Sequence, residues 1–301
     1  PEEEHELLTR SEAIPSDATK MTPSQDDNPP QLASAFSSTY QDPKPLEGPI
    51  NTAGAEDSPF ITPNGKTFFF WFSPTIKAAS ESVNDGSTGI YTTSFDGTSW
   101  SKPERVFTGW DVLDGCPTYH DGKLYFCSAR KNEEMQMYVA DYDGTDLSDG
   151  DLTSLEEYTG HSGIGELHVI DDGNTIFYSS KGSSGQNYDL YEIERKDGTW
   201  QDPVALDGVN TDDAENQPFV SQDGKELWFT KQEVSGGELG APSVYRSTWD
   251  GSQWGSPTLV VSSLAGEPTL DGEGNLYFVH HYWDNDANSM IEADIYVCYK
   301  K

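Results

Sequence analysis

The stretch Glu56–Phe72, EDSPFITPNGKTFFFWF, sets a pattern that four later stretches of the chain repeat. Each copy has a short apolar run, a turn that carries glycine, and a second run rich in aromatic residues. The later copies are DGCPTYHDGKLYFCS at 114–128, GELHVIDDGNTIFYSS at 165–180, NQPFVSQDGKELWFTK at 216–231 and GEPTLDGEGNLYFVHH at 266–281. Their turn glycines recur every 50 to 57 residues. This period is typical of a blade-type array of short strands rather than of a single sandwich.

Each repeat continues with two more predicted strands. The third carries an apolar-Tyr pair such as Ile90-Tyr91, and the fourth follows an aromatic-x-x-Pro motif such as Trp100–Pro103. Proline suits the start of an outermost strand, because the backbone N–H that proline lacks is not needed there for pairing with another strand. The chain ends after a third strand and opens with an orphan fourth strand at about Pro43–Ile50. We therefore expect a five-bladed all-β propeller of four-stranded blades over residues 39–301, closed by the N-terminal strand, which completes the last blade.

Residues 1–38 differ from the repeats in composition. They are polar, acidic and proline-bearing, and they show no strand alternation. We expect an acidic N-terminal arm or tether that lies on or outside the propeller. On this interpretation, deletion of residues 1–50 cripples folding, whereas deletion of residues 1–38 leaves the fold intact.

The repeats resemble those of the WD40-like, TolB-type β-propeller family. The resemblance covers about Tyr40–Lys301 and is carried by stretches such as INTAGAEDSPFITPNGKTFFF and VNTDDAENQPFVSQDGKELWF. It implies an exported propeller without a family set of catalytic residues, since the family includes assembly factors, peptidoglycan-associated proteins and many uncharacterised exported proteins. The third repeat departs most from the pattern, because Glu166-Leu167 replaces the usual x-Pro pair.

Acidic residues dominate the composition. The 52 Asp and Glu residues against 18 Lys and Arg give a net charge of −34 over 301 residues. Such a surface repels nucleic-acid phosphate, so we exclude nucleic acid as a partner. No apolar run reaches about 18 residues, so we expect no membrane span. The charge suits a halophilic or marine organism or an extracellular setting. Because the chain begins at Pro1 without Met, we also expect an exported protein whose signal peptide has been removed.

Loops that lead into the first strand of each repeat deliver carboxylates to one face of the expected ring. These rim residues are Glu56, Asp57, Asp114, Glu166, Asp212, Asp213, Glu215 and Glu267. Basic groups follow the second strands at roughly equivalent positions, and they are Arg130, Lys181, Lys231 and His281. Like charges so close cannot all stay ionised unaided, so we expect protonation, ion pairing or a bound cation. Either the basic groups pair with the rim and join neighbouring blades, or both sets form a pocket for a polar ligand.

The rim is compatible with two kinds of function. The first is a non-catalytic binding module that requires no cofactor and holds a glycan or protein partner, with Trp71, Trp110, Tyr282 and Trp283 near the same face as aromatic platforms. The second is a glycoside hydrolase of the five-bladed type, with Asp57 as base, Glu166 or Glu215 as acid and Asp114 as modulator. Binding is favoured, because the repeats are too alike for one specialised catalytic blade. A structural component of a surface assembly is a third interpretation.

Two smaller features concern metal and cysteine chemistry. Asp284, Asp286 and Asn288 space oxygen donors as in a calcium loop, although Ser289 stands where an EF-hand has glycine. Calcium is therefore a candidate ligand, whereas no zinc spacing occurs. A two-residue turn at Asp121–Gly122 would place Cys116 opposite Cys127 on neighbouring strands, close enough for a disulfide or for two free thiols.

Overall fold

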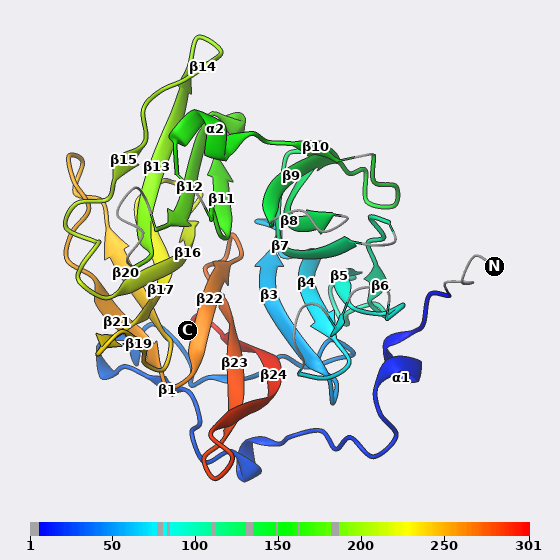
Figure 1. Cartoon of the computed structure of the whole chain (residues 1–301). Helices are drawn as coiled ribbons and strands as arrows, with labels where there is room; N and C mark the ends of the chain where they lie inside the picture. The colour runs from blue at the N-terminus through cyan, green and yellow to red at the C-terminus, as the bar shows by residue number, and fades with distance from the viewer. Residues whose placement is uncertain are drawn as a thin grey trace.

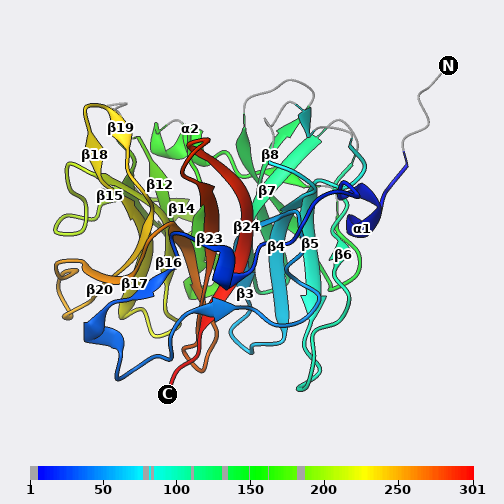
Figure 2. The same cartoon turned by 90° about the horizontal axis from the view of Figure 1, so that it is seen from below.

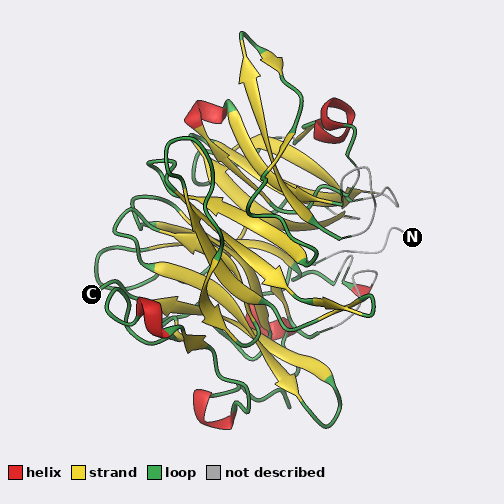
Figure 3. Cartoon of the chain, turned by 90° about the vertical axis from the view of Figure 1, so that its left-hand side faces the viewer, coloured by secondary structure: helices red, strands yellow, loops and turns green. Residues whose placement is uncertain are grey.

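The computed structural model describes residues 6–76, 81–82, 85–109, 112–130, 135–148, 150–161, 163–181 and 187–301. Most of the regular structure in these residues is β-strand, so the fold is all-β as the repeats predict (Figure 3). The helical elements within them are short and lie outside the sheets: α1 (Arg10–Ala13), η1 (Pro23–Gln25), η2 (Ser34–Phe36), α2 (Leu155–Thr159) and η4 (Asp171–Gly173). None of the described helices is long and apolar enough to cross a membrane.

The strands pair in antiparallel groups whose innermost members gather around the centre of the molecule (Figure 1). The first group contains β3 (Ala55–Ile61), β4 (Thr67–Ser73), β5 (Gly89–Ser94) and β6 (Glu104–Arg105). The second contains β7 (Val112–His120), β8 (Lys123–Arg130), β9 (Gln136–Asp141) and β10 (Asp151–Leu152). The third contains β11 (Leu167–Ile170), β12 (Thr175–Ser180) and β13 (Asp189–Lys196), with β14 (Thr199–Trp200) and β15 (Val204–Ala205) both paired to β13.

Two further groups complete the circle. The fourth contains β16 (Ala214–Val220), β17 (Glu226–Gln232), β20 (Ser243–Thr248) and β21 (Thr258–Ser262). Between β17 and β20 the chain forms a separate hairpin of β18 (Val234–Ser235) and β19 (Glu238–Leu239). The fifth contains β22 (Ala265–Leu270), β23 (Leu276–Asp284) and β24 (Ser289–Cys298). A single parallel pair, Ala293 with Ala55, joins β24 to β3.

The N-terminal segment supplies the outer strand of the fifth group. Strand β2 (Lys44–Pro45) pairs antiparallel with β24, with Lys44 opposite Val297. The Leu46 N–H donates to the Ile295 carbonyl at 2.9 Å and extends this ladder. Residues from both ends of the described chain therefore share one sheet, which is the pairing that the repeat pattern predicts.

Aromatic side chains of the second strands fill the spaces between neighbouring sheets. Phe69 of β4 stacks on Tyr119 of β7 with ring centroids 5.7 Å apart, and Phe68 meets Tyr277 of β23 at 5.6 Å. Both phenylalanines are fully buried. Burying a side chain of this size contributes about 1.5–3 kcal/mol. The aromatic runs of the repeats are thus the packing surfaces that hold the groups in a circle.

The N-terminal arm, residues 6–38, lies across the ends of the first and fifth groups (Figure 2). Its Arg10 is buried and donates to Glu56 Oε1 at 3.0 Å and to the Ile50 carbonyl at 2.6 Å. The guanidinium also lies over the rings of Phe70 and Phe72 at 5.2 and 5.3 Å. This combination of a carboxylate, a carbonyl and aromatic faces is a complete site for one guanidinium.

Two more charged side chains fasten the arm to the fifth group. Lys20 forms ion pairs with the buried carboxylates of Glu292 and Asp294. Asp26 accepts from His280 Nε2 at 2.8 Å, and both of these side chains are buried. Beyond them, β1 (Gln31–Leu32) pairs with β21. The described part of the arm is therefore packed against the sheets at several points.

Candidate functional site

The inner strands carry the same kink where the repeats have an x-Pro pair. In β3 the pairing passes from Asp57 opposite Trp71 to Phe60 opposite Phe69, so Ser58 and Pro59 share one partner position. This is a β-bulge, and it recurs in β7, β16 and β22. The residue before each proline has a left-handed φ of 47° to 56°, at Ser58, Cys116, Gln217 and Glu267.

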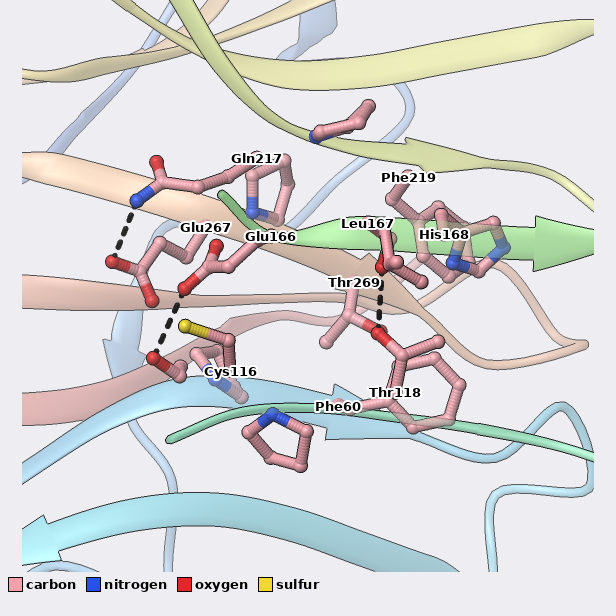
Figure 4. Close-up of a pocket in the computed structure, with 15 residues that line it drawn as sticks. Phe60, Cys116, Thr118, Glu166, Leu167, His168, Gln217, Phe219, Glu267 and Thr269 are labelled. Carbon is pink, nitrogen blue, oxygen red and sulfur yellow. Dashed lines mark hydrogen bonds between the residues drawn. The ribbon is translucent and has the colours of Figure 1, made fainter. Parts of the chain in front are cut away.

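Five equivalent side chains meet in one layer of the central channel: Ser58, Cys116, Glu166, Gln217 and Glu267 (Figure 4). With the two residues that follow each of them, they line a cavity of about 30 Å³. This is the volume of about one water molecule in the liquid. Hydrogen bonds cross the layer, because Ser58 Oγ donates to Glu166 Oε1 at 3.1 Å and Gln217 Nε2 donates to Glu267 Oε1 at 2.9 Å.

Three carboxyl groups lie at this layer and do not ionise alike. Burial, reinforced by the charges of Asp57 and Glu166, raises the pKa of Glu267 well above its usual range. Burial also raises the pKa of Glu166 to about 7, and Asp57 adds to that shift. For Asp57 the effect of burial is outweighed by contacts with His281, Glu267 and the Ser58 N–H, so its pKa is lowered. Asp57 therefore carries the charge at neutral pH and Glu267 holds a proton.

The surroundings of these groups agree with this assignment. Glu267 Oε2 is buried and forms no hydrogen bond with another described residue, so no donor there stabilises a negative charge on it. His281 Nε2 lies 3.8 Å from Asp57 Oδ2, which is within ion-pair range but too long for a direct hydrogen bond. His281 belongs to β23 and Asp57 to β3, so this contact links the fifth and first groups.

The next layer of the channel is mostly apolar. His168 packs there between Phe219, with centroids 4.4 Å apart, and Phe60, at 6.1 Å. Burial, and to a lesser extent the charge of His120, lowers the pKa of His168 to about 3. Its ring is neutral at physiological pH, and a pKa so far below 7 makes it a weak general base.

Two of the predicted rim carboxylates lie away from the channel. Glu56 and Glu215 are fully buried. Glu56 accepts from Arg10 and from the Thr52 N–H at 2.8 Å. Glu215 accepts from Thr211 Oγ1 at 2.6 Å and pairs with Lys231 at 3.2 Å. Both lie at the start of an inner strand and accept from the threonine of the Asn-Thr loop that precedes it, so their role here is to close that loop.

Asp114 and the remaining predicted basic groups also stay within their own sheets. Burial raises the pKa of Asp114 to about 6 despite nearby Ser128 and Arg130. The Arg130 guanidinium lies 4.1 Å from the centroid of the Tyr138 ring. Lys181 Nζ lies 5.3 Å from the ring centroid of Tyr188. Of the predicted ligand-binding set, the channel layer and its edge thus contain Asp57, Glu166, Glu267 and His281.

The expected placement of Cys116 directly opposite Cys127 is wrong by one residue. Gly115 is the partner of Cys127, because Cys116 occupies the bulge of β7. Both cysteines are free thiols. Contact with Cys127, together with burial, raises the pKa of Cys116 well above its usual range. Cys116 is therefore a neutral thiol in the channel wall.

The predicted calcium loop forms a turn between β23 and β24. Asp284 Oδ1 accepts from the backbone N–H groups of Asp286, at 2.8 Å, and Ala287, at 2.9 Å. This carboxylate closes the turn, and Asn288 follows with a left-handed φ of 50°. Among the described residues, no three His, Cys, Asp or Glu side chains come together as metal ligands do. Calcium binding at this loop stays a prediction.

A second pocket of about 550 Å³ lies beside the channel layer. It shares Gln217 and Glu267 with the small cavity and extends past His281 to Trp283 and Asn288. Of the other aromatic residues expected on this face, Tyr282 is fully buried and Trp110 lies outside the described residues. We define this space as the mouth pocket.

Sequence reasoning missed Ser58, Cys116 and Gln217 in the channel layer. The signal that could have identified them is their position, since each precedes the proline of its repeat. Alignment of the repeats at this position places Glu267, and Glu166 of the repeat with leucine in place of proline, in the same column. No comparable signal exists for the mouth pocket, because its walls come from loops that differ between repeats.

Comparison with known proteins supports the fold. No family model matches the sequence, and no curated protein matches it. An endo-arabinase from Bacteroides thetaiotaomicron superposes with a TM-score of 0.51 at 15% identity, over 86% of this chain and 99% of that one. Sucrose-6-phosphate hydrolase from Lactobacillus gasseri gives 0.52 at 12% identity, over 97% and 69%. TolB from Acinetobacter baumannii gives 0.47 at 15% identity, over 90% of this chain and 65% of that one. The all-β fold thus resembles β-propellers, and identities this low bear on the fold alone.

Proposed function

We propose that this protein is a non-catalytic binding module of the cell envelope or extracellular space, which holds a glycan or a protein partner at its channel face. We also propose that the fold is a five-bladed propeller built from TolB-type repeats, in which β2 completes the last blade. The grouping of the described strands into five antiparallel sets around one centre supports this blade count.

The observation that carries the binding proposal is the contrast between the two cavities. The channel layer, where the carboxyl groups meet, encloses only about 30 Å³ and has room for water alone. Glycoside hydrolysis requires two carboxyl groups that flank a bound glycosidic bond. The mouth pocket, at about 550 Å³, is within the usual range for small-molecule sites. A ligand therefore fits beside the carboxyl groups rather than between them.

The backbone of the channel layer is also consistent with a preorganised binding face. Four non-glycine residues there have left-handed φ values, and three of them, Ser58, Cys116 and Gln217, bear short or neutral side chains. Such conformations cost on the order of 1–3 kcal/mol each and cluster at ligand sites. Repetition of the same strained bulge fixes the direction of each side chain without requiring a helix or a metal.

A second candidate function is glycoside hydrolysis, and one observation favours it. Asp57 lies on β3 and Glu166 immediately precedes β11, the innermost strand of another sheet, and their pKa values move in opposite directions. Separated pKa values are what an acid and base pair requires. In this alternative Asp57 acts as the base and Glu166 as the acid, which requires the channel layer to open when substrate binds.

The experiment that separates the two functions uses a panel of plant, algal and bacterial polysaccharides, with and without calcium. Protein retention on each polysaccharide and release of reducing ends are measured on the same samples. We expect retention without release. Release that disappears in Glu166→Gln would replace the binding proposal with hydrolysis. If the protein shows no retention and no release, glycan binding is contradicted, and the search turns to a protein partner or a surface assembly.

A further inference from the structure

The mouth pocket has walls from two hairpins. One wall comes from β17 and the segment after β19, which contribute Gln232 and Pro242, and the other from the β23–β24 hairpin with Trp283 and Asn288. Its floor meets the channel layer at Glu267. Because each wall belongs to a different sheet, the pocket shape depends on how the fourth and fifth groups pack together.

Carboxamide groups dominate the polar lining of this pocket: Asn28, Gln217, Gln232, Asn285 and Asn288. Gln232 donates to the Gly240 carbonyl at 3.0 Å, and Asn28 donates to Asn285 Oδ1 at 3.3 Å. These bonds occupy one end of each amide, and among the described residues the Gln232 oxygen and the Asn285 nitrogen have no further partner. Gln217 likewise donates to Glu267 Oε1 at 2.9 Å and keeps its oxygen as an acceptor. The remaining amide atoms together provide donors and acceptors, which is the set needed to bind several hydroxyl groups at once.

An aromatic platform accompanies these amides. Trp283 is partly exposed and lies opposite Met290 in the β23–β24 ladder. Leu239 and Leu264 add apolar surface to the same pocket. A ligand with one apolar face and hydroxyl groups at its edges would pack on Trp283 and reach the amides, as in other largely apolar sites with a few placed polar groups.

The charges at the pocket determine which ligands of this kind fit. Among the described lining residues there is no Lys or Arg, and the titratable groups are His281 and Glu267. The whole chain carries a net charge of −34. A sulfated or uronic acid group would enter this field without a cationic partner, which is unfavourable. We therefore propose that the mouth pocket binds a short neutral saccharide, with Trp283 as the stacking platform and the five amides as hydroxyl ligands; this inference rests on the proposed glycan-binding function.

The N-terminal arm completes this site. Asn28 lies two residues after Asp26, and its backbone N–H donates to Asp26 Oδ1 at 2.9 Å. Asp26 in turn pairs with His280, the neighbour of the pocket residue His281. The position of Asn28 at the pocket edge therefore depends on the buried hydrogen bond between Asp26 and His280, which makes the arm part of the ligand site.

Titration calorimetry on the full chain tests this inference with neutral oligosaccharides and with uronic acid-containing oligosaccharides of equal length. We expect the parent protein to bind neutral ligands, and Trp283→Ala to weaken binding by about tenfold or more, as loss of a central aromatic contact does. Asn288→Gly is the second variant, because glycine accepts the left-handed φ of 50° while the amide is lost. Trp249→Ala is the matched control, since Trp249 is exposed and lies outside the pocket lining.

The outcomes separate the site, the ligand class and the proposed function. Weaker binding in Trp283→Ala and Asn288→Gly, with Trp249→Ala unchanged, supports the assignment. Neutral binding that is equal in all three variants overturns the site and leaves glycan binding intact. Tighter binding of the acidic oligosaccharide overturns the ligand class. Absence of any saccharide binding by the parent protein overturns the proposed function and this inference together.

Discussion

Glu166 is the carboxyl group in the channel whose charge changes near neutral pH. Its folded pKa of about 7 lies above the ordinary value of 4.5, so the folded protein binds the proton more tightly than the unfolded chain. Stability from this group is therefore present at low pH and is lost as pH rises through about 7. Glu166→Gln removes this loss and keeps an acceptor for Ser58. We therefore expect the Tm difference, variant minus parent, to grow by about 2–4 °C as the pH is raised from about 5 to about 8.

Thermal unfolding followed by circular dichroism over that pH range checks this prediction. Glu157→Gln is a suitable control, because Glu157 is an exposed glutamate of α2. Its Tm difference from the parent should stay constant with pH. Parallel pH profiles for Glu166→Gln and the parent would show that Glu166 does not titrate in this range.

The repeats predict which strands carry carboxylates but not which face of the strand each carboxylate occupies. Glu56 and Asp57 are adjacent on one strand, so they face opposite sides of the sheet. Only Asp57 reaches the channel edge. Glu56, Asp114 and Glu215 stand two residues before the bulge in their repeats, and all three are buried. Sequence analysis placed carboxylates on the correct strands, but it could not assign their faces without knowing that each x-Pro pair forms a bulge.

At the scale of elements, the arm makes contacts that its composition does not predict. The prediction that deletion of residues 1–38 leaves the fold intact is untested, and this segment carries Arg10, Lys20 and Asp26. Their partners lie 46, 274 and 254 residues away in the chain. No local pattern reports contacts at such separations. The composition of the arm alone therefore does not reveal that three of its charged side chains contact buried partners.

Truncation of the arm tests its contribution. Deletion of residues 1–9 keeps all three anchors and should change the Tm little. Deletion of residues 1–29 should lower it sharply, because removing one partner of a buried ion pair costs about 3–5 kcal/mol. A synthetic peptide of residues 6–30 should restore part of the loss in a concentration-dependent way. Equal Tm values for the two truncations would contradict a structural role for the arm.

The loops that enter the inner strands make a second kind of long-range contact, in which an asparagine side chain hydrogen-bonds to the backbone of the preceding sheet. Asn210 accepts from the Leu190 N–H at 2.8 Å and donates to the Leu190 carbonyl at 2.9 Å. Asn51 makes the same pair of bonds with Ile295, at 2.8 Å each. Each asparagine thus acts as an extra strand residue that joins one sheet to the third strand of the preceding sheet.

Asn210→Ala should therefore weaken the junction between the third and fourth groups. It leaves the N–H of fully buried Leu190 unpaired and removes one of the two bonds that its carbonyl accepts, since the Leu206 N–H still donates to that carbonyl at 3.0 Å. We expect a loss of about 2 kcal/mol in the free energy of unfolding. Chemical denaturation measures this loss. Asn210→Asp keeps the acceptor but not the donor, so its loss should be intermediate in a graded series. An unchanged midpoint in Asn210→Ala would show that water replaces both bonds.

At the scale of the whole molecule, the repeat period was sufficient to predict the all-β class and the pairing of the chain ends. The repeat period predicts the fold because each repeat buries its aromatic strand only against neighbouring repeats. The sequence pattern and the packing therefore have the same period. The mouth pocket and the arm contacts break that period. They could not be predicted, since they arise where one repeat meets a segment with no equivalent in the others.

The net charge of −34 acts on the whole molecule, because most of the exposed charges share one sign. Repulsion of this kind destabilises the compact state and is screened as the Debye length falls from about 10 Å at 0.1 M salt to about 3 Å at 1 M. We expect the Tm to increase steadily over that range, equally in NaCl and KCl. Calcium chloride at matched ionic strength distinguishes screening from a specific site, which would saturate at low concentration. If calcium gives such a saturating increase and Asp284→Asn abolishes it, the turn between β23 and β24 binds the ion. If all three salts give one curve, the acidic surface acts by charge alone.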